Sequence, residues 1–165
     1  YLAVSATGEA SQLWVELDPS RDPREGTLAW TWRVDRAVPG ARLTDPERDD
    51  APARLFVVFG EPGFLSAPRT LFYSWGGEEP AGRSFRSHVD DRIGVVVLRS
   101  AADPIGTWLE ESRDPAADYR SVFGEDSDEP ITAVGFMIDT DQTAATAVSG
   151  LLGITWTPDP SGSAP

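Results

Sequence analysis

Alternation of apolar and polar side chains with a period of two is the feature that most constrains the fold of this chain. Residues 12–17 and residues 27–34 both alternate in this way. In the first segment Leu13, Val15 and Leu17 share one side. Such alternation is typical of antiparallel strands that bury one face, so we expect these three side chains to be buried.

Other segments are more continuously apolar and rich in Val, Ile, Phe and Tyr, as central strands covered on both faces are. They are residues 53–60, 70–75, 93–99 and 131–139. Residues 1–6 and 151–157 add two shorter candidates, which brings the expected number of strands to about eight.

Only one segment carries helix start and stop signals. Asp114 suits an N-cap, Pro115 the first helical position and Gly124 the position after the last turn. One short helix near 115–123 cannot supply the crossovers of a parallel sheet. We therefore expect an all-β fold, an antiparallel two-sheet β-sandwich of jelly-roll type. The 165 residues suit a single domain over 1–158, followed by a flexible tail over 159–165.

Charge excludes some classes of partner. The chain has 14 basic residues against 27 acidic ones, a net charge of −13. Nucleic acids and anionic membrane surfaces are disfavoured, because both bind clustered cations. No segment has the roughly 20 apolar residues of a membrane span. All basic residues are Arg and none is Lys, which suits either a high-salt habitat or GC-rich coding. The opening at Tyr1, directly in a strand-like run, suggests that something upstream was cleaved or trimmed, and a cleaved export signal of a periplasmic or extracellular protein is one explanation.

A run of oxygen donors follows the strand expected over 131–139. Asp139, Asp141 and Thr143 alternate there, so their oxygens could converge on Ca²⁺. In the alternative interpretation, these side chains cap the turn through hydrogen bonds to the backbone.

Six tryptophans make sugar binding a hypothesis, because flat rings stack on pyranose faces. Trp14 lies opposite the apolar side of its strand and is the best candidate for an exposed ring. Tyr73 and Trp75 end a strand beside Gly76 and Gly77, where a loop could open a groove.

Polar residues near Trp108 allow two interpretations. Trp108, Arg113 and Asp118 could form the wall of a binding pocket, or Arg113 and Asp118 could pair to hold the helix against a sheet. Arg54 also allows two interpretations. It forms a structural ion pair if it is buried beside Asp49 or Asp50, and it binds a ligand if it faces a groove.

Catalytic signals are weak. The sole histidine, His88, lies in a polar stretch without a nucleophile elbow. One His and no Cys cannot build a zinc centre. Pairs such as Glu110 and Glu111, or Asp139 and Asp141, could act on glycosides, but a chain with 27 acids contains such pairs by chance.

Several motifs in fixed order resemble one known family. They are Ala53-Arg54-Leu55-Phe56-Val57-Val58-Phe59, Leu71-Phe72-Tyr73-Ser74-Trp75, Gly106-Thr107-Trp108, Asp118-Tyr119-Arg120 and Ile138-Asp139-Thr140-Asp141-Gln142-Thr143. Together they resemble the bacterial domain of unknown function family 3047 (DUF3047) over nearly the whole chain. The resemblance implies export and a sandwich related in shape to carbohydrate-binding modules, and it implies no established activity.

These observations favour a non-enzymatic extracytoplasmic binding module for a carbohydrate or another small polar ligand. An accessory subunit that docks on a larger extracytoplasmic assembly by a sheet face or edge is the alternative. A glycoside-acting enzyme is a minor one.

Overall fold

The computed structural model describes residues 1–17, 26–61 and 67–158. The tail expected over 159–165 lies outside the described residues. Within the described residues, ten strands and one helix follow in chain order: β1 (Leu2–Thr7), β2 (Ala10–Glu16), β3 (Gly26–Arg36), β4 (Ala51–Phe59), β5 (Arg69–Trp75), β6 (Ser84–Arg86), β7 (Ile93–Arg99), β8 (Leu109–Arg113), α1 (Pro115–Phe123), β9 (Ile131–Asp139) and β10 (Thr146–Pro158).

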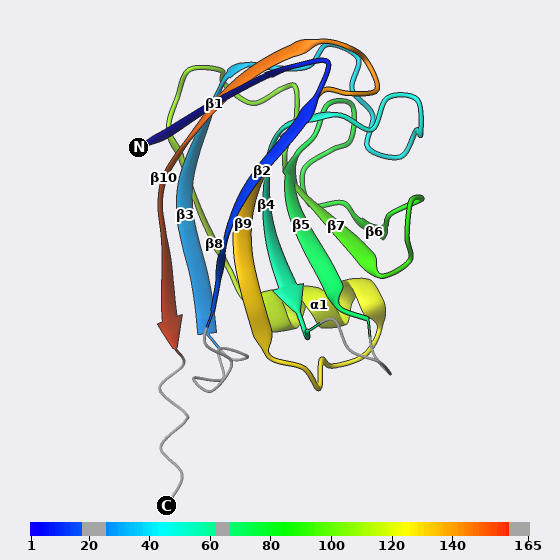
Figure 1. Cartoon of the computed structure of the whole chain (residues 1–165), viewed down its shortest axis with the longest axis vertical. Helices are drawn as coiled ribbons and strands as arrows, with labels where there is room; N and C mark the ends of the chain where they lie inside the picture. Colours follow the sequence, from blue (N-terminus) through cyan, green and yellow to red (C-terminus); the bar gives the residue numbers. More distant parts are fainter. Residues whose placement is uncertain (18–25, 62–66, 159–165) are drawn as a thin grey trace, which may run out of the picture.

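The strands form two sheets, which confirms the expected all-β sandwich. One sheet has four strands in the order β1-β10-β3-β8, and the other has six in the order β2-β9-β4-β5-β7-β6. Figure 1 shows the four-stranded sheet on the left and the six-stranded sheet on the right. All pairs are antiparallel except β5 with β7, whose connection runs through β6. The jelly-roll order of connections stays a prediction.

The core between the sheets is aromatic. Trp30 and Trp32 of β3 lie edge to face with ring centroids 5.7 Å apart, and Trp32 packs in turn on Trp75 of β5 at 5.8 Å. Each of these three rings is at most 3% exposed. Alternation along β3 thus places its apolar side inward, as the sequence predicts.

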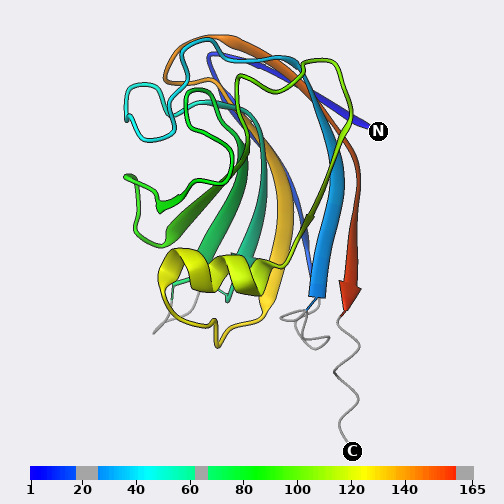
Figure 2. The same ribbon diagram turned by 180° about the vertical axis from the view of Figure 1, so that it is seen from behind.

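The helix closes one end of the sandwich. Asp114 caps it by accepting hydrogen bonds from the N–H groups of Ala116 and Ala117, and Gly124 ends it in the left-handed conformation at φ 80°. Figure 2 shows α1 across the lower end of the six-stranded sheet. The helix contacts β6 and β7 of that sheet and β3 of the other. Its inward residues Tyr119 and Phe123 join the core. Among the described residues, no helix has the length and hydrophobicity that a bilayer span needs.

One expectation about burial is wrong. Every residue of β2 is exposed, including Leu13 at 59% and Val15 at 65%. These two lie opposite Phe136 and Val134 of β9, which are buried. Because β2 is an edge strand of its sheet, the side of β2 that continues the core face is left uncovered.

Candidate functional site

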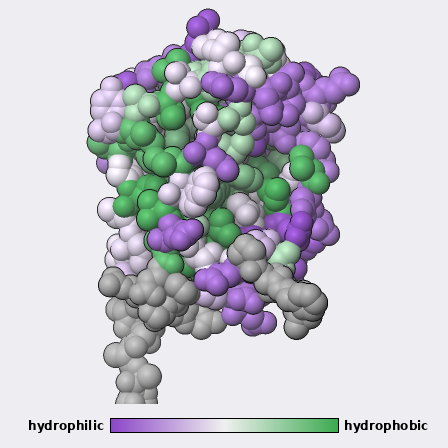
Figure 3. All heavy atoms as spheres, in the orientation of Figure 1, coloured by the Kyte–Doolittle hydropathy of each residue, from purple (hydrophilic) through white to green (hydrophobic). Residues whose placement is uncertain are grey.

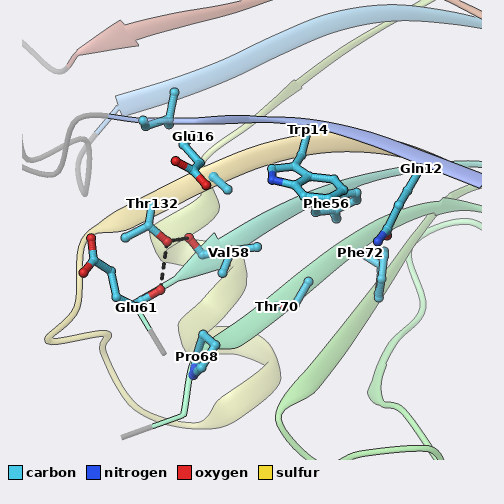
Figure 4. Close-up of a pocket in the computed structure, with 13 residues that line it drawn as sticks. Gln12, Trp14, Glu16, Phe56, Val58, Glu61, Pro68, Thr70, Phe72 and Thr132 are labelled. Carbon is cyan, nitrogen blue, oxygen red and sulfur yellow. Dashed lines mark hydrogen bonds between the residues drawn. The ribbon is translucent and has the colours of Figure 1, made fainter. Parts of the chain in front are cut away.

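A groove crosses the outer face of the six-stranded sheet, on the side away from the core. It has a volume of about 680 Å³ and is lined by β2, β9, β4 and β5 together with residues 17, 60, 61 and 68. Its aromatic residues are Trp14, Phe56 and Phe72. Figure 4 shows their side chains along the sheet.

Strand register explains why these rings come together. Trp14 lies opposite Gly135, Gly135 opposite Phe56, and Phe56 opposite Phe72, so the four residues form one row across four strands. A Cβ atom on Gly135 would lie 2.2 Å from Cζ of Phe56. The glycine therefore lets the Phe56 ring lie close to the sheet, where it forms an apolar floor that is 7% exposed. Trp14, at 51% exposed, stands at the edge of this floor.

Polar groups line the rest of the groove. Gln12 and Glu16 flank Trp14 on the same side of β2. Thr132 comes from the neighbouring strand β9, Glu61 from the segment after β4, and Thr70 from β5. The Thr132 hydroxyl lies 2.8 Å from the carbonyl oxygen of Gly60, to which it donates. Among the described residues that line the groove, two are acidic and none is basic.

Two of the aromatic residues expected to bind a ligand lie in the core instead. Tyr73 and Trp75 are 0% and 1% exposed, because their side of β5 faces the other sheet. Trp108 is on the surface but far from the groove, on the other sheet: its ring packs edge to face on Tyr1 at 5.4 Å and beneath the Arg33 guanidinium at 4.7 Å. Of the expected aromatic ligands, only Trp14 lines the groove.

Arg113 and Asp118 form a structural pair and not a pocket wall. Asp118 accepts hydrogen bonds from Nε of Arg113 and from the Tyr73 hydroxyl, both at 2.9 Å. The three residues belong to β8, α1 and β5, so the contact joins the helix to both sheets. Burial, reinforced by the negative charge of Asp118, raises the pKa of Tyr73 well above 10. Tyr73 therefore stays a neutral donor.

Arg54 is likewise a buried structural cation. It is 8% exposed, and its Nη2 lies 2.5 Å from Oδ1 of Asp49 and its Nη1 3.3 Å from Oδ2 of Asp139. Its guanidinium lies 5.5 Å from the centroid of the Phe72 ring. Arg54 therefore supports one end of the groove without lining it.

The expected calcium ligands gather with a residue that the sequence did not indicate. Carboxylate oxygens of Asp50, Asp139 and Asp141 all lie within 4.8 Å of one another. Thr143 takes a different position from the expected one: its N–H and its hydroxyl both donate to Asp50, so it orients a carboxylate. Burial, together with the negative charge of Asp141 and against the opposing charge of Arg54, raises the pKa of Asp139 to about 6.

Two of the residues considered for catalysis, Glu111 and His88, have structural partners. Glu111 accepts hydrogen bonds from Nε of Arg99 at 2.6 Å and from Nε1 of Trp32 at 2.9 Å. His88 lies 3.7 Å from Asp49. Neither residue reaches the groove.

Sequence reasoning did not assign Phe56 and Phe72 to a binding surface, and it did not assign Asp50 to the metal cluster. Both phenylalanines lie in strands that carry large apolar side chains on each face, a pattern that predicts cover by protein and does not distinguish an open ligand face. The signal that could have found them is Gly135 inside a strand, since a strand glycine often marks a close approach.

Comparison with known proteins gives a family and no activity. No curated protein matches the chain. Residues 1–155 match the model of the family described as protein of unknown function DUF3047. Because this match spans most of the chain, the protein belongs to the DUF3047 family.

Proposed function

We propose that the protein is a non-enzymatic binding module that holds an uncharged carbohydrate in the groove on its six-stranded sheet. The observation that carries the proposal is the exposed Trp14 ring at the edge of an apolar floor made by Phe56 and Phe72. A half-exposed indole beside polar groups is suited to stack on the apolar face of a pyranose ring.

The charge of the groove narrows the class of ligand. With Glu16 and Glu61 at its border and no basic residue among its described lining, the groove disfavours phosphates, sulfates and uronic acids. Glutamate, glutamine and threonine side chains suit the hydroxyl groups of a neutral sugar, because their oxygens accept hydrogen bonds from those groups. The groove crosses four strands of the sheet and suits a chain of linked sugars better than a single ring.

The test is a calorimetric titration with four hexasaccharides: β-1,4-linked glucose, β-1,4-linked N-acetylglucosamine, β-1,4-linked xylose and α-1,4-linked glucose. At least one should bind, and Trp14→Ala should weaken that binding at least about tenfold, a loss of about 1.4 kcal/mol that is typical of an aromatic anchor. Trp108→Ala is the matched control, since it removes a surface indole outside the groove, and it should leave affinity unchanged.

Three results would contradict the proposal. If no hexasaccharide binds at millimolar concentration, a carbohydrate ligand is excluded. If wild type and Trp14→Ala bind with equal affinity, the groove is excluded as the binding site. Release of shorter sugars during incubation, abolished in Glu16→Gln, would make the protein a glycoside-acting enzyme.

A specific observation also favours the second candidate, an accessory subunit that docks by a sheet edge. Leu13 and Val15 of β2 and Ile154 of β10 are exposed apolar side chains, and each continues the core-facing side of its sheet. In Figure 3 hydrophobic residues gather over β10, β3 and β2. Exposed strand edges with apolar side chains are typical association surfaces.

One variant, Leu13→Arg, compared with wild type, separates the two candidates. If docking is the function, wild type should associate with a co-purifying partner in sedimentation velocity and should bind no hexasaccharide. Leu13→Arg should then abolish the association with that partner. If the groove is the function, Leu13→Arg should bind hexasaccharide as wild type does. Under either candidate, the export expected from the family resemblance remains part of the proposal.

A further inference from the structure

Three carboxylates meet where the chain passes from one sheet to the other. Asp139 is the last residue of β9, Asp141 lies in the turn that leads to β10, and Asp50 directly precedes β4. β9 and β10 belong to different sheets, so this corner links the two layers.

The buried carboxylate of Asp139 lacks part of its hydrogen bonding. Asp139 is 6% exposed. Its Oδ2 contacts Arg54 at 3.3 Å, whereas its Oδ1 is buried and has no hydrogen-bond partner. A buried charged oxygen without a partner is costly, so this atom indicates a missing ligand.

From this arrangement we propose that Asp50, Asp139 and Asp141 bind a calcium ion. Two oxygens that bind one calcium ion at 2.3–2.6 Å lie at most about 5 Å apart, and the three carboxylates meet this condition at 4.8 Å. The donors are all oxygens, which favours a hard cation over zinc or copper. Asp141 is exposed and leaves a side open to water ligands.

Local hydrogen bonds hold the site in position. Asp50 is fully buried and accepts from the N–H groups of Gln142 at 3.1 Å and Thr143 at 2.8 Å, as well as from the Thr143 hydroxyl. A carboxylate has about four lone-pair sites, so Asp50 can still bind a cation.

Nearby cations do not already neutralise the cluster. Arg54 shares its guanidinium between Asp139 and Asp49, so one positive charge faces four carboxylates once Asp50 and Asp141 are counted. A divalent cation removes that excess and joins the segment before β4 to the β9–β10 turn.

The experiment is calorimetric titration of EDTA-treated protein with calcium chloride, together with thermal unfolding. Wild type should bind one calcium ion per chain, and calcium at 100 times its Kd should raise Tm by roughly 5–10 °C. Asp141→Asn, which changes an exposed residue, should weaken binding at least about tenfold, and Asp139→Asn should do the same. The control is Asp126→Asn, an exposed aspartate that pairs with Arg120 outside the cluster, which should bind like wild type.

Two results would overturn the proposal. One is the absence of both heat and Tm change for folded wild type at about 10 mM calcium, above the Kd range of weak calcium modules. The other is equal weakening by Asp126→Asn and Asp141→Asn, which would mean that calcium only screens the net charge of −13. Since no carboxylate of the cluster lines the groove, hexasaccharide binding in Asp141→Asn reports on the groove independently.

Discussion

The contact of Tyr73 with Asp118 gives the most detailed prediction of stability. The Tyr73 hydroxyl is buried, donates to Asp118 at 2.9 Å and shares that carboxylate with Arg113. Tyr73→Phe removes one hydrogen bond to a charged acceptor and leaves Asp118 paired with Arg113. We expect a loss of about 1.5–2 kcal/mol in the free energy of unfolding.

Asp118→Ala should cost more, because it leaves the Tyr73 hydroxyl buried without an acceptor. The lost hydrogen bond and the orphaned hydroxyl together amount to about 3–5 kcal/mol. Arg113 adds little to this sum, because its side chain is 36% exposed and water replaces its partner. Once Asp118 is alanine, Tyr73→Phe removes only the orphaned hydroxyl and should be neutral or stabilising.

The assay is urea unfolding of wild type, both single variants and the double variant, followed by tryptophan fluorescence. We expect a coupling free energy of at least about 1.5 kcal/mol from the double-mutant cycle. Additive losses, with a coupling below about 0.5 kcal/mol, would show that the hydroxyl and the carboxylate do not interact and would refute the reasoning.

The remaining predictions concern pH, the groove floor and the helix cap. Because the pKa of Tyr73 is raised in the folded protein, the unfolded chain releases a proton above pH 10 that the folded chain keeps. The free energy of unfolding should therefore fall with rising pH, by about 1.4 kcal/mol at pH 11. Tyr73→Phe should lack this loss in urea unfolding. Gly135→Ala places a Cβ atom 2.6 Å from the Leu13 carbonyl oxygen and 2.2 Å from Phe56; we expect a loss of about 1–3 kcal/mol in urea unfolding and weaker hexasaccharide binding. Asp114→Ala removes the N-cap of α1 and should lower stability by about 1 kcal/mol, measured in the same way.

Positions of strands could be predicted from this sequence because pairing in a sheet leaves a local pattern. Each of the eight expected strands has a counterpart, and the helix over 115–123 begins and ends where its caps predict. The three residues of β6 and the polar β8 were missed, since neither shows an apolar face of useful length.

Which side of a strand is covered could not be predicted. Alternation shows that Leu13 and Val15 share a face, but whether another layer lies over that face depends on the position of β2 at the sheet edge. In β5 each face carries an aromatic side chain, so the pattern could not tell that Tyr73 points into the core while Phe72 points to the groove.

Contacts between distant segments were the other limit. Asp139 and Asp141 were visible as a pair because they are two residues apart at a strand end. Asp50 joins them only through the pairing of Ala51 with Asp139, which no local pattern reveals.

The most direct test of the proposed function is an NMR titration that follows the indole N–H signals of the six tryptophans. The ligand added is a hexasaccharide that binds in the calorimetric titration. Trp14→Phe identifies the signal of Trp14 by its loss. The account predicts that this signal shifts in proportion to occupancy, while the signals of the buried Trp32 and Trp75 stay in place. A shift of the Trp108 signal with the Trp14 signal unmoved would place the ligand on the other sheet and contradict the account.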